Sequence, residues 1–108
     1  MTDYCKIEIF IPETHLAVLQ ETLRDCGAGH IGNYDSCMSY SRVISTWRPL
    51  DGSNPYSGEV GKITTETEIK AEVTCKVSEI DAVISAVKHI HPYEEPVINV
   101  TPLIRTGL

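Results

Sequence analysis

The sequence is short of positive charge. Its 108 residues hold nine lysines and arginines against fifteen aspartates and glutamates, which gives a formal net charge of −6. Because a nucleic-acid backbone is bound by clustered basic side chains, these scattered cations argue against a nucleic-acid partner. The chain also lacks a long apolar run and a charged leader followed by an apolar one. We therefore expect no membrane span, no export and a cytoplasmic location.

The cysteines lack the spacing of a metal-binding or redox motif. The four of them are far apart in the sequence and form no CxxC pair. Without a secretory signal, reduced thiols are expected rather than disulfides. The signatures GxSxG and HExxH are absent as well, so no set of nucleophile, base and orienting group is identifiable.

Two apolar patterns alternate along the chain, one typical of strands and one of helices. Strand-like alternation is clearest near the N-terminus and after residue 62. In the first of these strands Cys5 has the inward parity. In the later one Ile63 and Cys75 have the inward parity and Glu68 the solvent-exposed one. Pro102 confines the last strand to a sheet edge or a bulge. The expected strands cover residues 4–11, 34–48, 63–77 and 97–104.

Helical spacing fills the gaps between these strands. An apolar stripe over residues 12–26 ends at Gly27, and a second over residues 78–90 ends at Pro92. The order βαββαβ predicts an α+β fold, the ferredoxin-like sandwich, with a four-stranded antiparallel sheet and two helices on one face. At this length we expect a single domain over residues 1–108.

The second strand and the loop after it are long for so small a sandwich. A single copy of the chain would expose an extended sheet edge, and such edges are usually covered or paired. We therefore expect a homo-oligomer.

The segment "GAGHIG", Gly27 to Gly32, matches the letters of a dinucleotide-binding GxGxxG. That motif needs a strand before it and a helix after it, and here the order is reversed. A helix end with a tight turn is the better interpretation.

The segment "HIHPYEEP", residues 89–96, concentrates side chains that ligate metals. His89 and His91 lie on different sides of a helix and cannot bind one ion together. Helix termination by Pro92 explains the segment without a metal. A zinc or copper site would need His91, Glu94 or Glu95, completed by His30 or Cys37. Because both helix-to-strand turns are expected at one end of the sheet, His30 and His91 are expected to approach one another.

Two further features admit more than one interpretation. Cys37, after "GNYDS", is either a reactive thiol or a small buried hydrophobe. The segment "TWRPLDGSNPYSG" contains Trp47, Arg48 and Tyr56 in a loop able to contact a ligand or a protein, although Trp47 has an equal claim to pack under the loop or against another copy.

Three segments carry a resemblance to a known family. In order and spacing, "GAGHIGNYDSC", "WRPLDGSNPYSGEVGK" and "HPYEEPVINVTPL" resemble the PII-like, CutA-like domain inserted in longer members of the Nif-three-like family, and its free-standing relatives. The resemblance implies a PII-like ferredoxin sandwich and a trimer, favoured over a dimer, in which long hairpins wrap around neighbours. In the longer proteins the resemblance assigns metal binding to a separate flanking domain, which these 108 residues do not resemble, so we do not expect their hydrolase or GTP cyclohydrolase label to apply.

The residues and the resemblance together predict a non-catalytic, oligomeric PII-like domain that binds a small ligand or a divalent metal in a regulatory role. The alternatives are a small enzyme using Cys37 or a metal-activated water, and an adaptor that docks a protein through loop 49–58. The candidate metal ligands are His30, His91, Glu94 and Glu95. The candidate ligand-binding residues are Asn33, Tyr34, Cys37, Trp47, Arg48, Glu59 and Tyr93.

Overall fold

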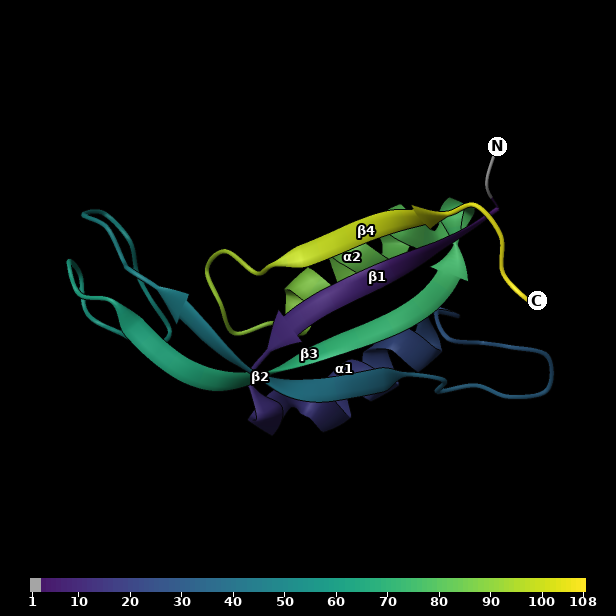
Figure 1. Cartoon of the computed structure of the whole chain (residues 1–108), viewed down its shortest axis with the longest axis horizontal. Coiled ribbons are helices and arrows are strands. Elements are labelled where there is room, and N and C mark those ends of the chain that lie inside the picture. Colours follow the sequence, from purple (N-terminus) through teal and green to yellow (C-terminus); the bar gives the residue numbers. More distant parts are fainter. Residues whose placement is uncertain (1–2) are drawn as a thin grey trace.

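The computed structural model describes residues 3–108, and its elements follow the predicted order βαββαβ (Figure 1). A short 3-10 turn leads into each helix, Glu13–His15 before the first and Val77–Glu79 before the second. The strands are β1 (Tyr4–Ile11), β2 (Ser39–Trp47), β3 (Thr64–Lys76) and β4 (Ile98–Leu103), and the helices are α1 (Leu16–Asp25) and α2 (Ile80–Ile90).

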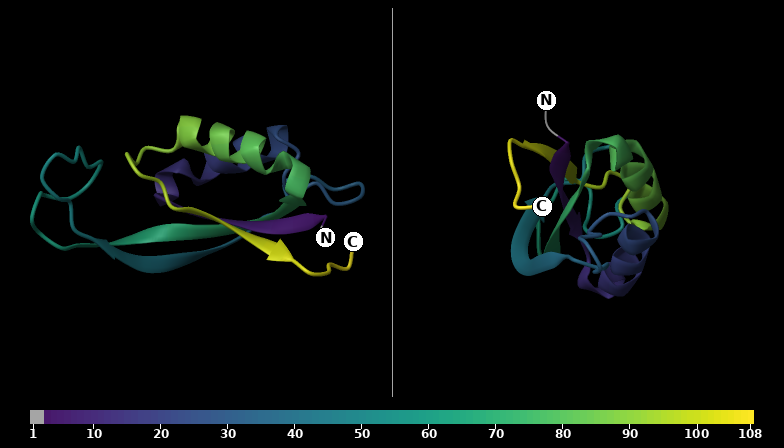
Figure 2. Two further views of the ribbon diagram at one scale, coloured as in Figure 1. Left: turned by 90° about the horizontal axis from the view of Figure 1, so that it is seen from above. Right: turned by 90° about the vertical axis from the view of Figure 1, so that its right-hand side faces the viewer.

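The four strands form one antiparallel sheet in the order β2-β3-β1-β4. Both helices cover the same face of this sheet (Figure 2). The predicted α+β, ferredoxin-like sandwich is therefore confirmed, with β1 and β3 in the centre and β2 and β4 at the edges. Pro102 lies on the edge strand β4, where a missing N–H is tolerated.

The core lies between the sheet and the two helices. Alternate residues of β1 and β3 point into it, and Leu19, Leu23, Val83 and Val87 meet them from the helices. Cys5 and Cys75 are opposite one another in the register, fully buried as predicted, with their Sγ atoms 3.5 Å apart. All four cysteines are free thiols.

One part of the sheet extends beyond the sandwich. The pairing of β1 with β3 stops at Ile11 and Ile69, whereas the pairing of β2 with β3 continues to Trp47 and Thr64. The β2–β3 hairpin beyond Ile69 therefore forms an arm, which curves back toward the loop between α2 and β4 (Figures 1 and 2). We call this segment, residues 43–68, the arm.

Two expectations about the strands were wrong. β2 begins at Ser39 and not at residue 34, because the backbone turns at residues 31–34 and Ser36 takes a positive φ of 58°. Ile63 precedes β3 and is 73% exposed, since the arm has no helix layer beneath it. Within residues 3–108 no helix is long and apolar enough to cross a membrane.

Candidate functional site

A cavity of about 600 Å³ lies at the base of the arm. Its walls come from the arm, from the end of β1 and from the loop between α2 and β4. Phe10 and Val97 contribute apolar wall, and Phe10 N donates a hydrogen bond to the Val97 carbonyl oxygen over 3.2 Å. The cavity thus sits where three segments distant in sequence converge.

A buried carboxylate belongs to this wall. Glu68 is 5% exposed, and its Oε2 atom accepts a hydrogen bond of 3.0 Å from the Tyr93 hydroxyl. Alternation had placed Glu68 on the wet face, which was wrong. The pattern within β3 does not reveal that Tyr93, from the loop between α2 and β4, covers this position.

Tyr93 keeps its proton in this environment. Burial first, and then the hydrogen bond to Glu68, raise the pKa of the phenol above its usual value. The hydroxyl is therefore neutral and is available as the donor to the carboxylate. This contact fixes the α2–β4 loop to the arm.

Aromatic rings line the same cavity. The ring centroid of Tyr93 lies 6.1 Å from that of Trp47 and 5.8 Å from that of Tyr56, with interplanar angles of 46° and 50°. Trp47 is oriented by its Nε1 atom, which donates to the Ser57 carbonyl oxygen over 3.1 Å. Trp47 and Tyr93 were predicted as ligand-binding residues, and the structure brings them together.

The loop at the end of the arm is tied to the α2–β4 loop. Asn54 N donates to Glu94 Oε2 over 2.9 Å, and Ser57 donates through Oγ to Glu66 Oε1 over 2.7 Å. The Ser53 hydroxyl is buried against the cavity without a hydrogen-bond partner in the described structure. None of these polar groups of loop 49–58 was singled out from the sequence as a contact residue, and the role of Asn54 depends on a carboxylate in a distant loop.

His91 is used by the fold. Its Nε2 atom lies 2.6 Å from the Phe10 carbonyl oxygen, and its Nδ1 atom accepts from Tyr93 N over 3.2 Å. The proton is therefore assigned to Nε2, which donates to Phe10. Burial lowers the pKa of His91, with the nearby charge of His15 acting in the same direction, and the ring is neutral.

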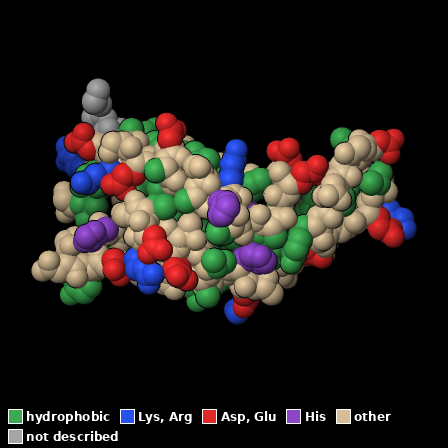
Figure 3. Space-filling view, turned by 180° about the vertical axis from the view of Figure 1, so that it is seen from behind, with side chains coloured by type: hydrophobic (Ala, Val, Ile, Leu, Met, Phe, Trp, Pro, Cys, Tyr) green, Lys and Arg blue, Asp and Glu red, His purple; other side chains and the backbone are tan. Residues whose placement is uncertain are grey.

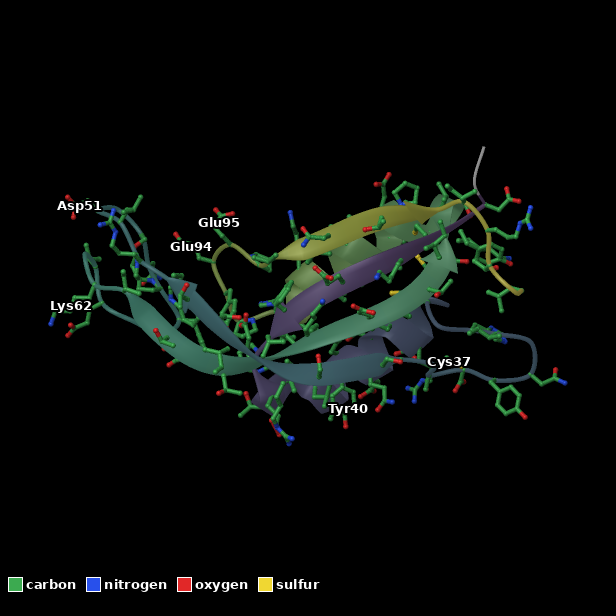
Figure 4. All side chains as sticks on the ribbon, in the orientation of Figure 1. Cys37, Tyr40, Asp51, Lys62, Glu94 and Glu95 are labelled. Atoms are coloured by element: carbon green, nitrogen blue, oxygen red, sulfur yellow. The ribbon has the colours of Figure 1, made fainter. Side chains whose placement is uncertain are left out.

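The expected approach of His30 and His91 was wrong. α1 and α2 run in opposite directions, so α1 ends beside the start of α2, as shown by Gly27 against Glu79. His30 shares a small cavity with Glu79, whereas His91 lies at the other end of the sheet against Phe10. Figure 4 shows the same separation between Cys37 and the pair Glu94 and Glu95.

The predicted metal ligands do not assemble in one chain. Both ring nitrogens of His91 are engaged, and Glu94 accepts from Asn54. Among residues 3–108, no group of three or more His, Cys, Asp or Glu side chains is placed to hold a metal ion. The donor set therefore does not fit a zinc or copper ion within a single copy.

The remaining predicted ligand-binding residues are dispersed. Arg48 lines the cavity with an exposed side chain, and Glu59 pairs with Lys62 over 2.8 Å near the tip of the arm. Asn33 and Tyr34 are exposed in the turn after α1. Cys37 Sγ lies 3.7 Å from the Asp35 carbonyl oxygen.

Comparison with known proteins gives concordant results. The family described as CutA1 divalent ion tolerance protein matches residues 56–107. Proteins called GTP cyclohydrolase 1 type 2 homolog match most of the chain, at 37% identity over 94% of it in Halalkalibacterium halodurans and 36% over 94% in Bacillus subtilis. The chain spans about a quarter of these relatives, 27% of each.

Among solved structures, too, this chain is similar to part of a NIF3-related protein and to CutA proteins. A Bacillus cereus protein related to NIF3 superposes with a TM-score of 0.83 at 34% identity, covering 96% of this chain and 26% of that one. Over nearly its whole length, this chain is similar to one segment of NIF3-related proteins. The resemblance seen in the sequence motifs is thereby confirmed.

CutA proteins themselves share the fold of this CutA-like domain. The periplasmic divalent cation tolerance protein CutA from Archaeoglobus fulgidus superposes with a TM-score of 0.72 at 21% identity, covering 95% of this chain and 86% of that one. At this identity the likeness concerns architecture. The site has to be interpreted from the side chains of this chain.

Proposed function

We propose that this CutA-like domain is a non-catalytic module that binds a small molecule in the cavity at the base of the arm, in a regulatory role. The observation that carries the proposal is the cavity itself, whose volume falls within the range of about 300–1,000 Å³ typical of ligand pockets. Its lining combines apolar and aromatic side chains with an equal number of polar and charged ones, and a mixture of apolar wall and oriented polar groups is typical of binding sites for small molecules.

The contacts around the cavity support a preformed site. The pairs Tyr93 with Glu68 and Asn54 with Glu94 join the arm to the α2–β4 loop at two points. A ligand that enters therefore meets walls already held in position, and less ordering free energy opposes binding.

Binding is tested by calorimetry with a panel of small cations, anions and neutral compounds, preceded by native mass spectrometry of the purified protein to detect a molecule carried through purification. We expect saturable binding of at least one class. Trp47→Ala should abolish it, whereas Tyr34→Ala, at the other end of the sheet, should leave it unchanged. Binding that survives Trp47→Ala, or no binding by any class, would overturn the proposal.

We also infer that the domain works as a homo-oligomer, with the trimer favoured. The exposed apolar side chains Tyr40 and Ile44 lie on the edge strand β2, and Val60 and Ile63 are exposed on the arm. Covering such an edge with another copy would bury this surface. Light scattering should give three times the mass of the chain, and a mass equal to one chain would contradict this inference.

The other hypotheses stay predictions. Zinc or copper binding would need a site shared between copies, because the ligands of one copy do not assemble. For the enzyme hypothesis, Cys37 contacts a backbone oxygen and no general base in the described residues. For the adaptor hypothesis, loop 49–58 exposes Leu50 and Tyr56, and loss of a bound protein on substitution of Leu50 would support it.

A further inference from the structure

The lining of the cavity has more negative than positive charge. Glu68, Glu94 and Glu95 contribute carboxylates to it, and Arg48 contributes a guanidinium whose side chain is exposed. Acidic side chains are visible where the arm joins the body in the space-filling view (Figure 3). An anionic ligand would meet net repulsion here, and a cation would meet net attraction.

Glu68 identifies the ligand class more sharply than the overall charge does. It is 5% exposed, it receives one hydrogen bond from Tyr93, and the ion pairs found among residues 3–108 do not include it. A buried carboxylate without a paired cation is unfavourable, because a single neutral donor does not replace the lost hydration. The cavity opens onto this side chain, so a cationic ligand would supply the missing charge.

The aromatic wall distinguishes an organic cation from a metal ion. Trp47, Tyr56 and Tyr93 provide inclined rings beside the carboxylate. A weakly hydrated ammonium group is attracted to ring faces and accepts an apolar environment. A divalent metal ion requires several ligating atoms at short distance, and no such group exists among the described residues.

We propose that the cavity binds a small organic cation, with an alkylated ammonium group against Trp47 and Tyr93 and its charge balanced by Glu68. This inference rests on the proposed small-molecule function and specifies its ligand class.

Calorimetry with three probes tests the inference on the full chain. The probes are choline, its uncharged isostere 3,3-dimethyl-1-butanol, and inorganic phosphate. Because a desolvated cation–π contact contributes about 2 kcal/mol, choline should bind about thirtyfold more tightly than the isostere. Phosphate should not bind. This comparison uses the unmodified protein and depends on no variant folding correctly.

Glu68→Gln tests the carboxylate directly. The amide oxygen can still accept from Tyr93, so the fold is retained while the charge is lost. Choline should bind about tenfold more weakly, and the isostere should be unaffected. Glu72→Gln is the matched control, because Glu72 lies on the same strand but faces Lys6 and Lys70 outside the cavity. Choline binding to that variant should change by less than about twofold, since the charge removed is distant and screened.

The outcomes separate this inference from the proposed function. Equal binding of choline and its isostere, or choline binding unchanged in Glu68→Gln, overturns the cation and leaves a small-molecule site. Phosphate binding that disappears in Trp47→Ala also overturns the cation proposal and leaves a small-molecule site. If none of the three probes and no compound of the wider panel binds, both the cation proposal and the small-molecule function are overturned. A second copy of the chain filling the cavity would give this result.

Discussion

The two ends of the sheet both display residues of the kind that bind ligands, but they organise them in opposite ways. In the turn after α1, residues 27–38, the backbone makes hydrogen bonds to other backbone groups, while several side chains are exposed to solvent. Gly29 N donates to the Thr74 carbonyl oxygen over 2.9 Å and Cys37 N to the Gly29 carbonyl oxygen over 3.1 Å, while Tyr34 is 73% exposed. At the base of the arm the Glu68 side chain itself is buried, and the half-buried Tyr93 donates a hydrogen bond to it.

This difference separates a structural turn from a binding site. In the turn, backbone N–H groups find backbone partners, although Glu79 Oε2, beside Gly27, is buried there without a hydrogen-bond partner in the described structure. At the arm, the Glu68 carboxylate is buried and accepts one hydrogen bond, from Tyr93, and the Ser53 hydroxyl is buried without a hydrogen-bond partner in the described structure. Ligand-type residues clustered in sequence are therefore a weaker indication of a site than a buried charge beside a cavity.

The largest effect should come from breaking the backbone packing of the turn with Gly29→Ala. Gly29 has a φ of +74°, and a Cβ atom there would lie 2.5 Å from the Cys37 carbonyl oxygen. Left-handed strain of about 1–2 kcal/mol adds to this overlap with backbone, so we expect the free energy of unfolding to fall by about 3–4 kcal/mol. Urea unfolding followed by circular dichroism measures it.

Gly32→Ala is the control for this substitution. Gly32 also has a positive φ, of +57°, but no atom lies within 4 Å of its added Cβ. The loss should be the strain alone, about 1–2 kcal/mol. Equal losses in the two variants would show that the close approach at Gly29 contributes nothing.

A smaller effect is expected at the other end of the sheet from Tyr93→Phe. The substitution keeps the ring but removes the donor to Glu68, leaving a buried carboxylate without that hydrogen bond. The free energy of unfolding should fall by about 1–3 kcal/mol. Tyr34→Phe, with an exposed hydroxyl, should stay within about 0.5 kcal/mol of the unmodified chain. If the two variants prove equally stable in urea, the buried contact is not stabilising.

The fold was predictable because its information is local and repeated. Alternation in β1 and β3 and the apolar stripes of α1 and α2 each define a buried face, and the order of elements selects the sandwich. The errors occur where the parity of a residue along a strand no longer indicates whether its side chain faces the core. Ile63 has the inward parity but lies beyond the helices, and β2 starts late because of the turn at residues 31–34.

The site was only partly predictable. Trp47 and Tyr93 were recognised as residues able to contact a ligand, but their meeting depends on the curvature of the arm toward the α2–β4 loop. Glu68 was assigned to solvent by a rule that considers one strand at a time. The proposed meeting of His30 and His91 failed because the direction of each helix was not followed from one end of the sheet to the other.

The smallest effect concerns the pH dependence that His91 gives to the cavity end. Burial lowers its pKa in the folded chain, and His15 acts in the same direction, while the Phe10 hydrogen bond and Glu68 oppose them. The unfolded chain, with an ordinary histidine pKa near 6.5, therefore takes up the proton first as the pH falls. Stability is fully present above about pH 6.5 and declines below it, toward the folded pKa, by at most about 1.4 kcal/mol per pH unit.

His91→Gln should flatten this decline between about pH 6.5 and 5, a window above the ordinary titration of aspartate and glutamate. Urea unfolding across that window measures the slope, and the variant is compared with its own stability at pH 7.5 because it loses some stability at every pH. His89 is two residues before His91 and its side chain is exposed, so His89→Gln should retain the slope of the unmodified chain. A slope that persists in His91→Gln, or disappears in His89→Gln, would mean that acidification weakens the fold elsewhere. If instead the slope follows His91, its cause is structural: protonation of Nδ1 removes the acceptor for Tyr93 N and thereby loosens the loop that covers Glu68.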